Sequence, residues 1–354
     1  MRSTSPGVSW RRSRDPARDR ARVRQRSSAM TAGIVVAGID AGATSTTCVI
    51  ADETGRILGV GRGGPIDHLY RAAGRRRTRA SLQAAIRQAA RRARLRRPLD
   101  AVVAGLTGLE PDSSESRTAV RMINGLIRAK IVVAAWDAEV AFAGASAGEP
   151  GVMVIAGTGS VALGRNAKGR TARAGGYGFL IDDAGGGVAV GQAALRAALW
   201  SMDGRGPRTR LAALLQRRFG RWPEVRRRVY GEGGGRPFLA SLAPMAVAAA
   251  RAGDAEAKAI LADAGRSLAA LGVAVAKRLR MQREPCALYA VGGMFEAGPF
   301  VLDTMKSTLR AALPRAVIRP PRYPPVIGAV LMALEASGVA LTPGIHRRLA
   351  RARL

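Results

Sequence analysis

Short apolar runs separated by turn residues open the patterned part of the chain. Those at residues 34–39, 46–51 and 57–61 predict three consecutive strands of a β-meander. Residues 69–94 predict a long helix that packs on this sheet, because apolar residues recur there at spacings of three and four. The recurring residues are Leu82, Ala85, Ile86, Ala89 and Ala90.

Two all-apolar runs, at residues 101–106 and 131–135, predict buried strands on either side of a helix near residues 116–129. The strand and turn pattern then repeats. The second half has predicted strands at residues 152–156, 161–165, 171–174 and 286–291, and predicted helices through most of 188–283 and at 300–313 and 326–337. The whole pattern predicts an α/β protein.

The repeat divides the chain into two predicted lobes. The first comprises residues 31–135 plus about 325–354, and the second comprises residues 136–324 with a helical insertion. A length of 354 residues with 47% hydrophobic content is enough for two separate cores. Residues 1–30 are rich in Arg, Ser and Pro and predict a disordered basic tail. Since Met30 directly precedes the first strand, a misassigned start explains this tail best.

Composition limits the setting in which the protein works. No apolar run approaches the roughly 20 residues needed to cross a bilayer, so we expect no membrane partner. Cys48 and Cys286 lie in separate apolar runs, which predicts buried thiols and a cytoplasmic location.

A formal net charge of +32 raises the question of a nucleic-acid partner. The arginines are scattered over predicted helix faces without interleaved aromatic residues, and only 4% of residues are aromatic. This distribution favours a solvated basic surface over nucleic-acid binding.

Two loops rich in Gly, Thr and Ser, residues 38–46 and 154–160, each follow an apolar run. Glycine lets main-chain N–H groups approach phosphate oxygens, and the hydroxyls add donors. Asp40 stands at the end of the first strand. The pair of loops therefore predicts two grips on one polyphosphate.

These loops, with the late Gly292-Gly293 turn, are similar to the three nucleotide signatures of the sugar kinase, heat-shock ATPase and actin superfamily. Residues 34–337 resemble its N-acetylglucosamine kinase branch, grouped with the BadF/BadG/BcrA/BcrD ATPase family. The resemblance implies a two-domain actin-like ATPase (ribonuclease H-like) fold with a cleft between the lobes, and ATP and Mg²⁺ as cofactors. The residues that it implies for the nucleotide are Gly42, Ala43, Thr44, Ser45, Gly157, Thr158, Gly159, Ser160, Gly292 and Gly293.

By the same resemblance, Asp40 would hold Mg²⁺ through water, and one carboxylate is chemically sufficient for this ion. Asp137 would be a second magnesium-side or substrate contact, although a helix N-cap explains it equally well. Glu110 stands where related kinases carry an aspartate that acts as base toward the sugar hydroxyl. Asp112 is a competing candidate, and a solvent-facing loop acid is the structural alternative for both.

The resemblance also assigns a sugar pocket. Asp67 replaces a customary Asn, which would favour a donor-rich or cationic ligand such as glucosamine. Its neighbour His68 fits a loop histidine better than a base. Tyr177 replaces a customary Trp, and Asp183 keeps one acid of a Gly-Asp-Glu-Gly turn.

The sequence thus predicts an ATP-dependent kinase that phosphorylates an amino sugar, N-acetylglucosamine or glucosamine, at O6. Two alternatives remain open: an ATPase activator of the radical dehydratase type, which needs thiolates for an iron–sulfur cluster, and an inactive sugar sensor. A homodimer is a possible assembly.

Overall fold

The computed structural model describes residues 33–110, 113–231 and 235–352. The predicted tail and Asp112 lie outside these ranges. By internal contacts the chain forms two compact units, residues 1–149 with 321–354 and residues 150–320, and each is described by itself.

Unit 1 is built on a five-stranded mixed sheet with the order β3-β2-β1-β4-β5. Its strands are β1 (Val35–Ala41), β2 (Thr46–Asp52), β3 (Ile57–Gly63), β4 (Leu99–Leu106) and β5 (Ala129–Trp136). The first three form the predicted antiparallel meander, and β4 and β5 run parallel to β1. Strand β4 is buried throughout, but Ile131 of β5 is 38% exposed. The prediction of full burial is therefore wrong for β5, because it is an edge strand.

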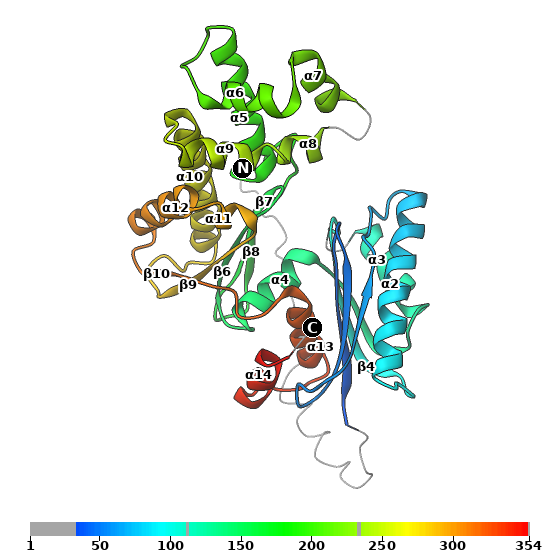
Figure 1. Ribbon diagram of the computed structural model, residues 1–354. Helices are drawn as coiled ribbons and strands as arrows, with labels where there is room; N and C mark the ends of the chain where they lie inside the picture. The colour runs from blue at the N-terminus through cyan, green and yellow to red at the C-terminus, as the bar shows by residue number, and fades with distance from the viewer. Residues whose placement is uncertain (1–32, 111–112, 232–234, 353–354) are drawn as a thin grey trace, which may run out of the picture. The chain divides into compact units, whose positions relative to one another are not determined.

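Helices cover both faces of this sheet (Figure 1). On one face α2 (Ala72–Arg92) and α3 (Ser114–Asn124) pack against Ala37 and Ile39 of β1. On the other face α13 (Pro325–Ala336), α4 (Asp137–Ser146) and α14 (Pro343–Ala350) share a core with Val36. Side chains alternate along a strand, so Asp40 lies on the face of Val36, the same side as α4.

Glycines allow β1, β4, α4 and α13 to approach closely. A Cβ added at Gly38 would overlap the main-chain nitrogen of Val330, and one at Gly328 would overlap the carbonyl oxygen of Val140. A Cβ at Gly105 would overlap the Val140 side chain. The beginning of α4, at Asp137, is therefore held at a fixed position against the sheet.

Unit 2 repeats the connectivity of unit 1, with the order β10-β9-β6-β7-β8. Its strands are β6 (Gly151–Ala156), β7 (Ser160–Arg165), β8 (Thr171–Gly175), β9 (Cys286–Val291) and β10 (Ala316–Arg319). Strands β6 to β8 form an antiparallel meander, β9 pairs parallel with β6, and β10 pairs parallel with β9. The same five-strand plan in both units confirms the predicted α/β repeat.

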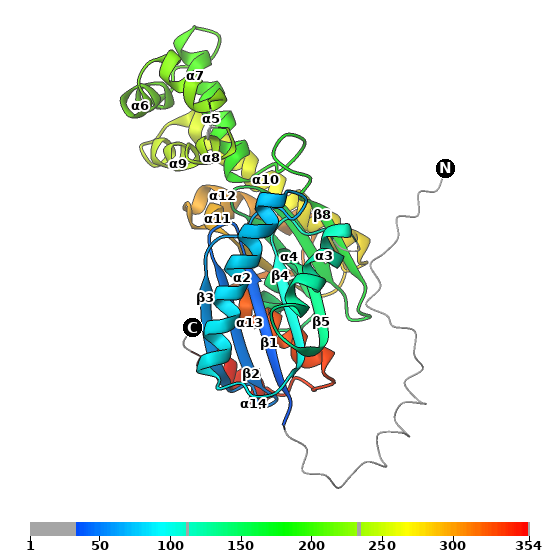
Figure 2. The same ribbon diagram turned by 90° about the vertical axis from the view of Figure 1, so that its right-hand side faces the viewer.

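Two long helices pack beside the unit 2 sheet, α10 (Ala255–Arg278) and α12 (Pro299–Ala312). The remaining helices form the predicted helical insertion and the short α11; they are α5 (Gly187–Met202), α6 (Arg210–Phe219), α7 (Trp222–Tyr230), α8 (Arg236–Ala240), α9 (Ala243–Arg251) and α11 (Gly293–Glu296). Figure 2 shows α6 and α7 stacked beyond α5 and α9. Helix α10 is long and apolar enough to cross a membrane by length and composition alone. Its buried residues belong to the unit 2 core, as in the central helices of globular domains.

The unit boundary differs from the predicted lobe boundary. Helix α4 belongs to unit 1, whereas the sequence pattern ended the first lobe at residue 135. The close packing of Gly328 and Gly144 between α4 and the α13 segment accounts for this, because it ties α4 to unit 1.

Candidate functional site

The carboxyl ends of three adjacent parallel strands in unit 1 bring Asp40, Thr107 and Asp137 to one edge of the sheet. Ala41 of β1 is in register with Leu106 of β4, which is in register with Trp136 of β5. Thr107 and Asp137 directly follow these positions, and the Thr107 N–H donates to the Ala41 carbonyl over 3.0 Å. Sequence analysis did not single out Thr107; its place after a buried strand is the signal that could have found it.

Asp40 and Asp137 form a partly buried carboxylate pair. Burial, and secondarily the negative charge of Asp137, raise the pKa of Asp40 to about 6. Burial also raises the pKa of Asp137, while hydrogen bonds from the Thr107 side chain and from the first N–H groups of α4 oppose this shift. The N-cap of α4 is Trp136 and Asp137 is the first residue of the helix, so the N-cap alternative for Asp137 is wrong, although its carboxylate does accept from the first N–H groups of α4.

This pair fits the demands of Mg²⁺. The ion takes one or two carboxylates, keeps several waters and completes its shell with substrate phosphates. Within the described residues no group of three or more His, Cys, Asp and Glu side chains could hold a metal. A two-carboxylate site at Asp40 and Asp137 suits Mg²⁺ better than a metal that requires an all-protein cage.

The first predicted phosphate loop joins β1 to β2. The Gly42 N–H donates to the Ser45 carbonyl over 2.9 Å, which closes a tight turn. Ala43, Thr44 and Ser45 at its tip are exposed. The loop starts two residues after Asp40 and keeps its tip accessible to a ligand.

Glu110 is exposed and lies on the loop after β4. Its main-chain oxygen accepts a hydrogen bond from the Ser113 hydroxyl over 2.6 Å. A Cβ added at Gly108, which has φ +70°, would lie 2.9 Å from Nδ1 of His68. The predicted sugar loop and the predicted base loop of unit 1 are therefore neighbours.

Asp67 contacts three residues near it, His68, Arg77 and Thr78. One carboxylate oxygen accepts from the His68 N–H over 2.7 Å, and the other lies 3.6 Å from Nη1 of Arg77. Its main chain exchanges two hydrogen bonds with the Thr78 hydroxyl. His68 stacks on Tyr70, with the ring centroids 5.1 Å apart. This loop presents a carboxylate whose charge is partly balanced by Arg77.

In unit 2 the second predicted phosphate loop is fixed on the N-terminus of α5. The Gly187 N–H donates to the Gly157 carbonyl over 2.7 Å, and the Val188 N–H donates to the Thr158 carbonyl over 3.0 Å. The Ser160 hydroxyl donates to the Ala184 carbonyl over 2.8 Å. These three hydrogen bonds hold the turn against the start of α5.

Asp183 packs against this loop. It is 5% exposed, has φ +65°, and its carboxylate occupies the space that a side chain at Gly159 would need. Tyr177, by contrast, is 62% exposed, with the Arg173 guanidinium 5.5 Å from its ring centroid. The structure places Asp183 beside the phosphate loop and leaves Tyr177 accessible.

A cavity of about 440 Å³ opens beside the same loop. Gly157, Thr158 and Gly187 form its wall at the loop, and Gly293 and Met294 come from the late glycine turn. Gly292 has φ +112°, and a Cβ there would lie 2.5 Å from the Ala156 carbonyl oxygen, so the two glycine segments are in direct contact. Sequence analysis missed the opposite wall, which is formed by α9 residues Ala243, Pro244, Val247, Ala248 and Arg251.

The alternative function, an ATPase activator with an iron–sulfur cluster, needs cysteine thiolates as ligands. Both cysteines are free and buried. Burial raises the pKa of Cys48 to about 12, and burial with the nearby charge of Glu284 raises that of Cys286 to about 11. Thiols of this kind stay protonated and are poor cluster ligands.

Comparison with known proteins finds a matching family. Residues 37–333 match the BadF/BadG/BcrA/BcrD ATPase family. The chain is 33% identical over 225 residues to the N-acetylmuramic acid/N-acetylglucosamine kinase of Clostridium acetobutylicum, which covers 63% of this chain and 74% of that protein. It is 32% identical over 204 residues to the N-acetyl-D-glucosamine kinase of Dictyostelium discoideum, with 56% and 64% covered.

The crystal structure of a proposed N-acetylglucosamine kinase from Chromobacterium violaceum superimposes with a TM-score of 0.66 at 27% identity. The match covers 85% of this chain and 99% of that one. The two units with one shared strand order have the actin-like ATPase fold. The chain belongs to the BadF/BadG/BcrA/BcrD ATPase family.

Proposed function

We propose that the protein is an ATP- and Mg²⁺-dependent kinase that phosphorylates an amino sugar, N-acetylglucosamine or glucosamine, at O6 in the cytoplasm. The observation that carries the proposal is that a chain of this family holds both the Asp40 and Asp137 carboxylate pair and the glycine-walled cavity at Gly157 and Gly293. The names of its relatives, both amino-sugar kinases, support the substrate class.

The cavity of unit 2 suits the nucleoside part of ATP. Its walls are mostly small and apolar, which fits a purine ring, and Gly157 and Thr158 offer main-chain N–H groups and a hydroxyl for phosphate oxygens. Chain neighbours aside, no side chain of the described residues lies within 4 Å of the Cβ positions at Gly157 and Gly293, so the backbone there can approach a ligand closely.

The carboxylate pair and the loop at residues 42–45, both in unit 1, suit Mg²⁺ and phosphate oxygens. Asp40 and Asp137 would hold Mg²⁺, which neutralises charge on the transferring phosphate. The exposed Thr44 and Ser45 hydroxyls and the Ala43 N–H would contact phosphate oxygens.

In the transfer step the sugar oxygen forms a bond to the γ-phosphorus while the bond to the ADP oxygen breaks. The hydroxyl proton passes to the carboxylate of Glu110, an exposed residue. Most of the rate enhancement in such transfers comes from positioning and charge neutralisation, with the base contributing a smaller share.

The choice of sugar depends on Asp67, His68, Tyr177 and Asp183. Asp67 alone would favour a protonated amine, but Arg77 lies 3.6 Å from its carboxylate and weakens that preference. Both glucosamine and its N-acetyl form are therefore proposed substrates.

An ADP-release assay on the purified protein tests the proposal. We expect turnover with glucosamine or N-acetylglucosamine only when Mg²⁺ is present, and little turnover with glucose. Sugar binding by calorimetry without ADP release would contradict the kinase proposal and favour a sensor. Mapping the phosphate by NMR tests O6, since attachment at O1 or O3 would contradict that assignment.

The variant Gly293→Ala tests the nucleotide site separately. Outside its chain neighbours and its own helix, the added methyl group meets no atom of the described residues within 4 Å, so the fold should be unchanged. It would project where the nucleotide is proposed to lie, and we expect the KM for ATP to rise about fivefold, which corresponds to about 1 kcal/mol. An unchanged KM would place the nucleotide elsewhere.

A further inference from the structure

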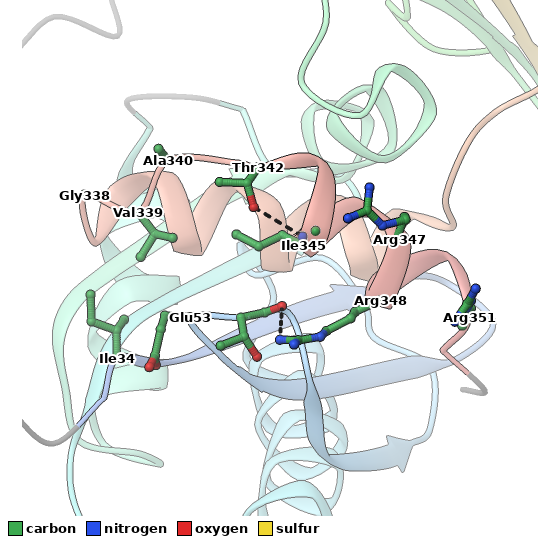
Figure 3. A pocket seen from close by; sticks show the side chains of 12 residues that line it. Ile34, Glu53, Gly338, Val339, Ala340, Thr342, Ile345, Arg347, Arg348 and Arg351 are labelled. Atoms are coloured by element: carbon green, nitrogen blue, oxygen red, sulfur yellow. Dashed lines mark hydrogen bonds between the residues drawn. The ribbon is translucent and has the colours of Figure 1, made fainter.

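A second large hollow lies on unit 1, between the β2–β3 turn and the C-terminal helix α14 (Figure 3). Its volume is about 810 Å³. Its apolar lining includes Ile34, Val339 and Ile345, and its polar lining includes Glu53, Thr54 and three arginines. None of these residues belongs to the proposed nucleotide, metal or sugar sites.

Arg347 and Arg348 belong to the short helix α14, and Arg351 is its C-cap. Arg348 reaches across to the β2–β3 turn, where its Nη1 donates to the Thr54 carbonyl over 3.2 Å, as Figure 3 shows. This bond fixes the guanidinium while leaving its other N–H donors available. In the part of the chain that the structure describes, no ion pair is formed by Arg347, Arg348 or Arg351.

A smaller hollow of about 610 Å³ shares Thr54, Arg348 and Arg351 with the first and adds Arg56. The same two arginines therefore border both hollows. Asp52, the acid of the smaller hollow, is occupied, because its carboxylate accepts from the Thr54 N–H and hydroxyl and from the Arg56 N–H. Within the described residues Asp52 forms no ion pair with Arg348 or Arg351.

Glu53 gives the larger hollow a second kind of chemistry. One of its carboxylate oxygens, Oε2, is buried and accepts no hydrogen bond from the described residues. A buried acceptor without a partner costs free energy, which a ligand that brings a donor would recover. Its charge also repels a bare anion, so an anionic group should bind at the arginines and a hydroxyl or amine near Glu53.

We propose that this hollow binds a small phosphate monoester that also carries hydroxyl or amine groups, with the phosphate on Arg348 and Arg351 and a donor group at Glu53. Guanidinium and phosphate form charge-assisted, often bidentate hydrogen bonds. A sugar phosphate, the product of the proposed kinase reaction, belongs to this chemical class. The binding proposal does not depend on the kinase proposal, but regulation of the enzyme by its product would rest on that proposed function.

The site is remote from the carboxylate pair. Ile34 precedes β1 and Asp40 lies near its end, and six residue steps of about 3.3 Å separate them by about 20 Å. A ligand in the hollow can therefore influence the carboxylate pair only through the fold and does not occupy that site.

Calorimetric titration of the full chain without nucleotide tests the proposal, with glucosamine 6-phosphate, inorganic phosphate and glucosamine as separate probes. We expect glucosamine 6-phosphate to bind more tightly than either of the others. Arg348→Gln and Arg351→Gln should each weaken it about tenfold or more, since each removes a charge-assisted hydrogen bond. Arg315→Gln is the matched control, because Arg315 is an exposed arginine that also donates one bond, to the Arg283 carbonyl over 3.1 Å.

Glu53→Ala should weaken glucosamine 6-phosphate and strengthen inorganic phosphate, an opposite pair of changes that a merely structural role would not produce. Unchanged affinity in Arg348→Gln and Arg351→Gln would overturn the proposal, and so would equal binding of the sugar phosphate and inorganic phosphate. The readout is binding, so a failure of the kinase assay leaves this test intact.

Discussion

The partly buried position of Asp40 near the end of β1, close to Asp137, raises its pKa. The ordinary pKa of Asp40 is 3.8, and in the folded protein it is about 6. The folded state therefore binds this proton more tightly than the unfolded state does. Its contribution to the free energy of unfolding is favourable at low pH and is lost as pH rises from about 3.8 to about 6. Ionised Asp40 thus destabilises the protein at neutral pH, as expected of a buried carboxylate that we propose to hold a cation.

We predict that Asp40→Asn stabilises the metal-free protein at pH 8 and abolishes ADP release. The gain in the free energy of unfolding should be about 2 to 3 kcal/mol at pH 8, from the size of the pKa shift. It should shrink toward pH 4.5, where the native carboxyl is already protonated. Thermal melts at both pH values measure it, with Asp263→Asn, an exposed surface acid, as control. A variant that is destabilised at pH 8 would contradict the assigned burial cost.

The proposed role of Glu110 as the base can be tested with a variant that keeps the fold. Its side chain is exposed and its main chain makes the turn contact with Ser113, so Glu110→Gln should keep the fold. We predict that kcat falls about 100-fold or more while the KM for ATP is unchanged, because the variant cannot accept the sugar proton. Steady-state ADP release measures both constants, and Glu115→Gln is a nearby control. Full activity in Glu110→Gln together with loss in Asp112→Asn would move the base to Asp112.

At the scale of elements, the apolar pattern predicted the strands and long helices well, because burial on a sheet leaves a periodic record in the sequence. Strand β10 and helix α14 escaped this reasoning. Strand β10 has only four residues, Ala316–Arg319, at the edge of its sheet, and α14 buries only Ile345 and Leu349. Such elements depend on their neighbours more than on their own pattern.

The candidate site residues also differ in how far the sequence predicts them. Asp40 and the glycine loops could be proposed from the sequence because their chemistry depends on a short local motif. Thr107 and the α9 wall of the cavity were not, because only the register of β4 and the packing of a distant helix bring them to the site.

The close contact of α13 with α4 gives a prediction at this scale. Gly328→Ala should destabilise the protein by several kcal/mol and reduce Mg²⁺-dependent ADP release, since the new Cβ overlaps backbone atoms of Val140 and Gly144 and must displace α4. Gly344→Ala, in α14, meets only a Thr342 hydroxyl at 3.5 Å and should be neutral or slightly stabilising. Urea titrations of the two variants compare the effects. Equal stability of both would mean that α4 is not held by this contact.

At the scale of the whole molecule, the net charge of +32 remains the feature least explained by the site. The structure does bring arginines onto aromatic rings: the guanidiniums of Arg218 and Arg228 lie 5.2 Å and 5.6 Å from the Phe219 ring centroid. The expectation that no aromatic residues interleave with the arginines is therefore wrong for residues 217–222, where Phe219 and Trp222 stand among Arg217, Arg218 and Arg221. These contacts engage the Phe219 ring within the protein, which leaves it less available for stacking on a base.

A solvated basic surface predicts weak nucleic-acid binding that depends on salt and not on sequence. Counterion release makes such binding fall steeply with salt, by about 300-fold or more between 50 and 200 mM if six or more phosphates of a single strand are contacted. Fluorescence anisotropy with several single-stranded 20-mers should therefore show binding at 50 mM NaCl that disappears near 200 mM, with the same affinity for every sequence. ADP release should be unchanged when the oligonucleotide is added at 150 mM salt. Tight binding of one sequence that persists at 200 mM would instead assign the arginines a specific nucleic-acid role.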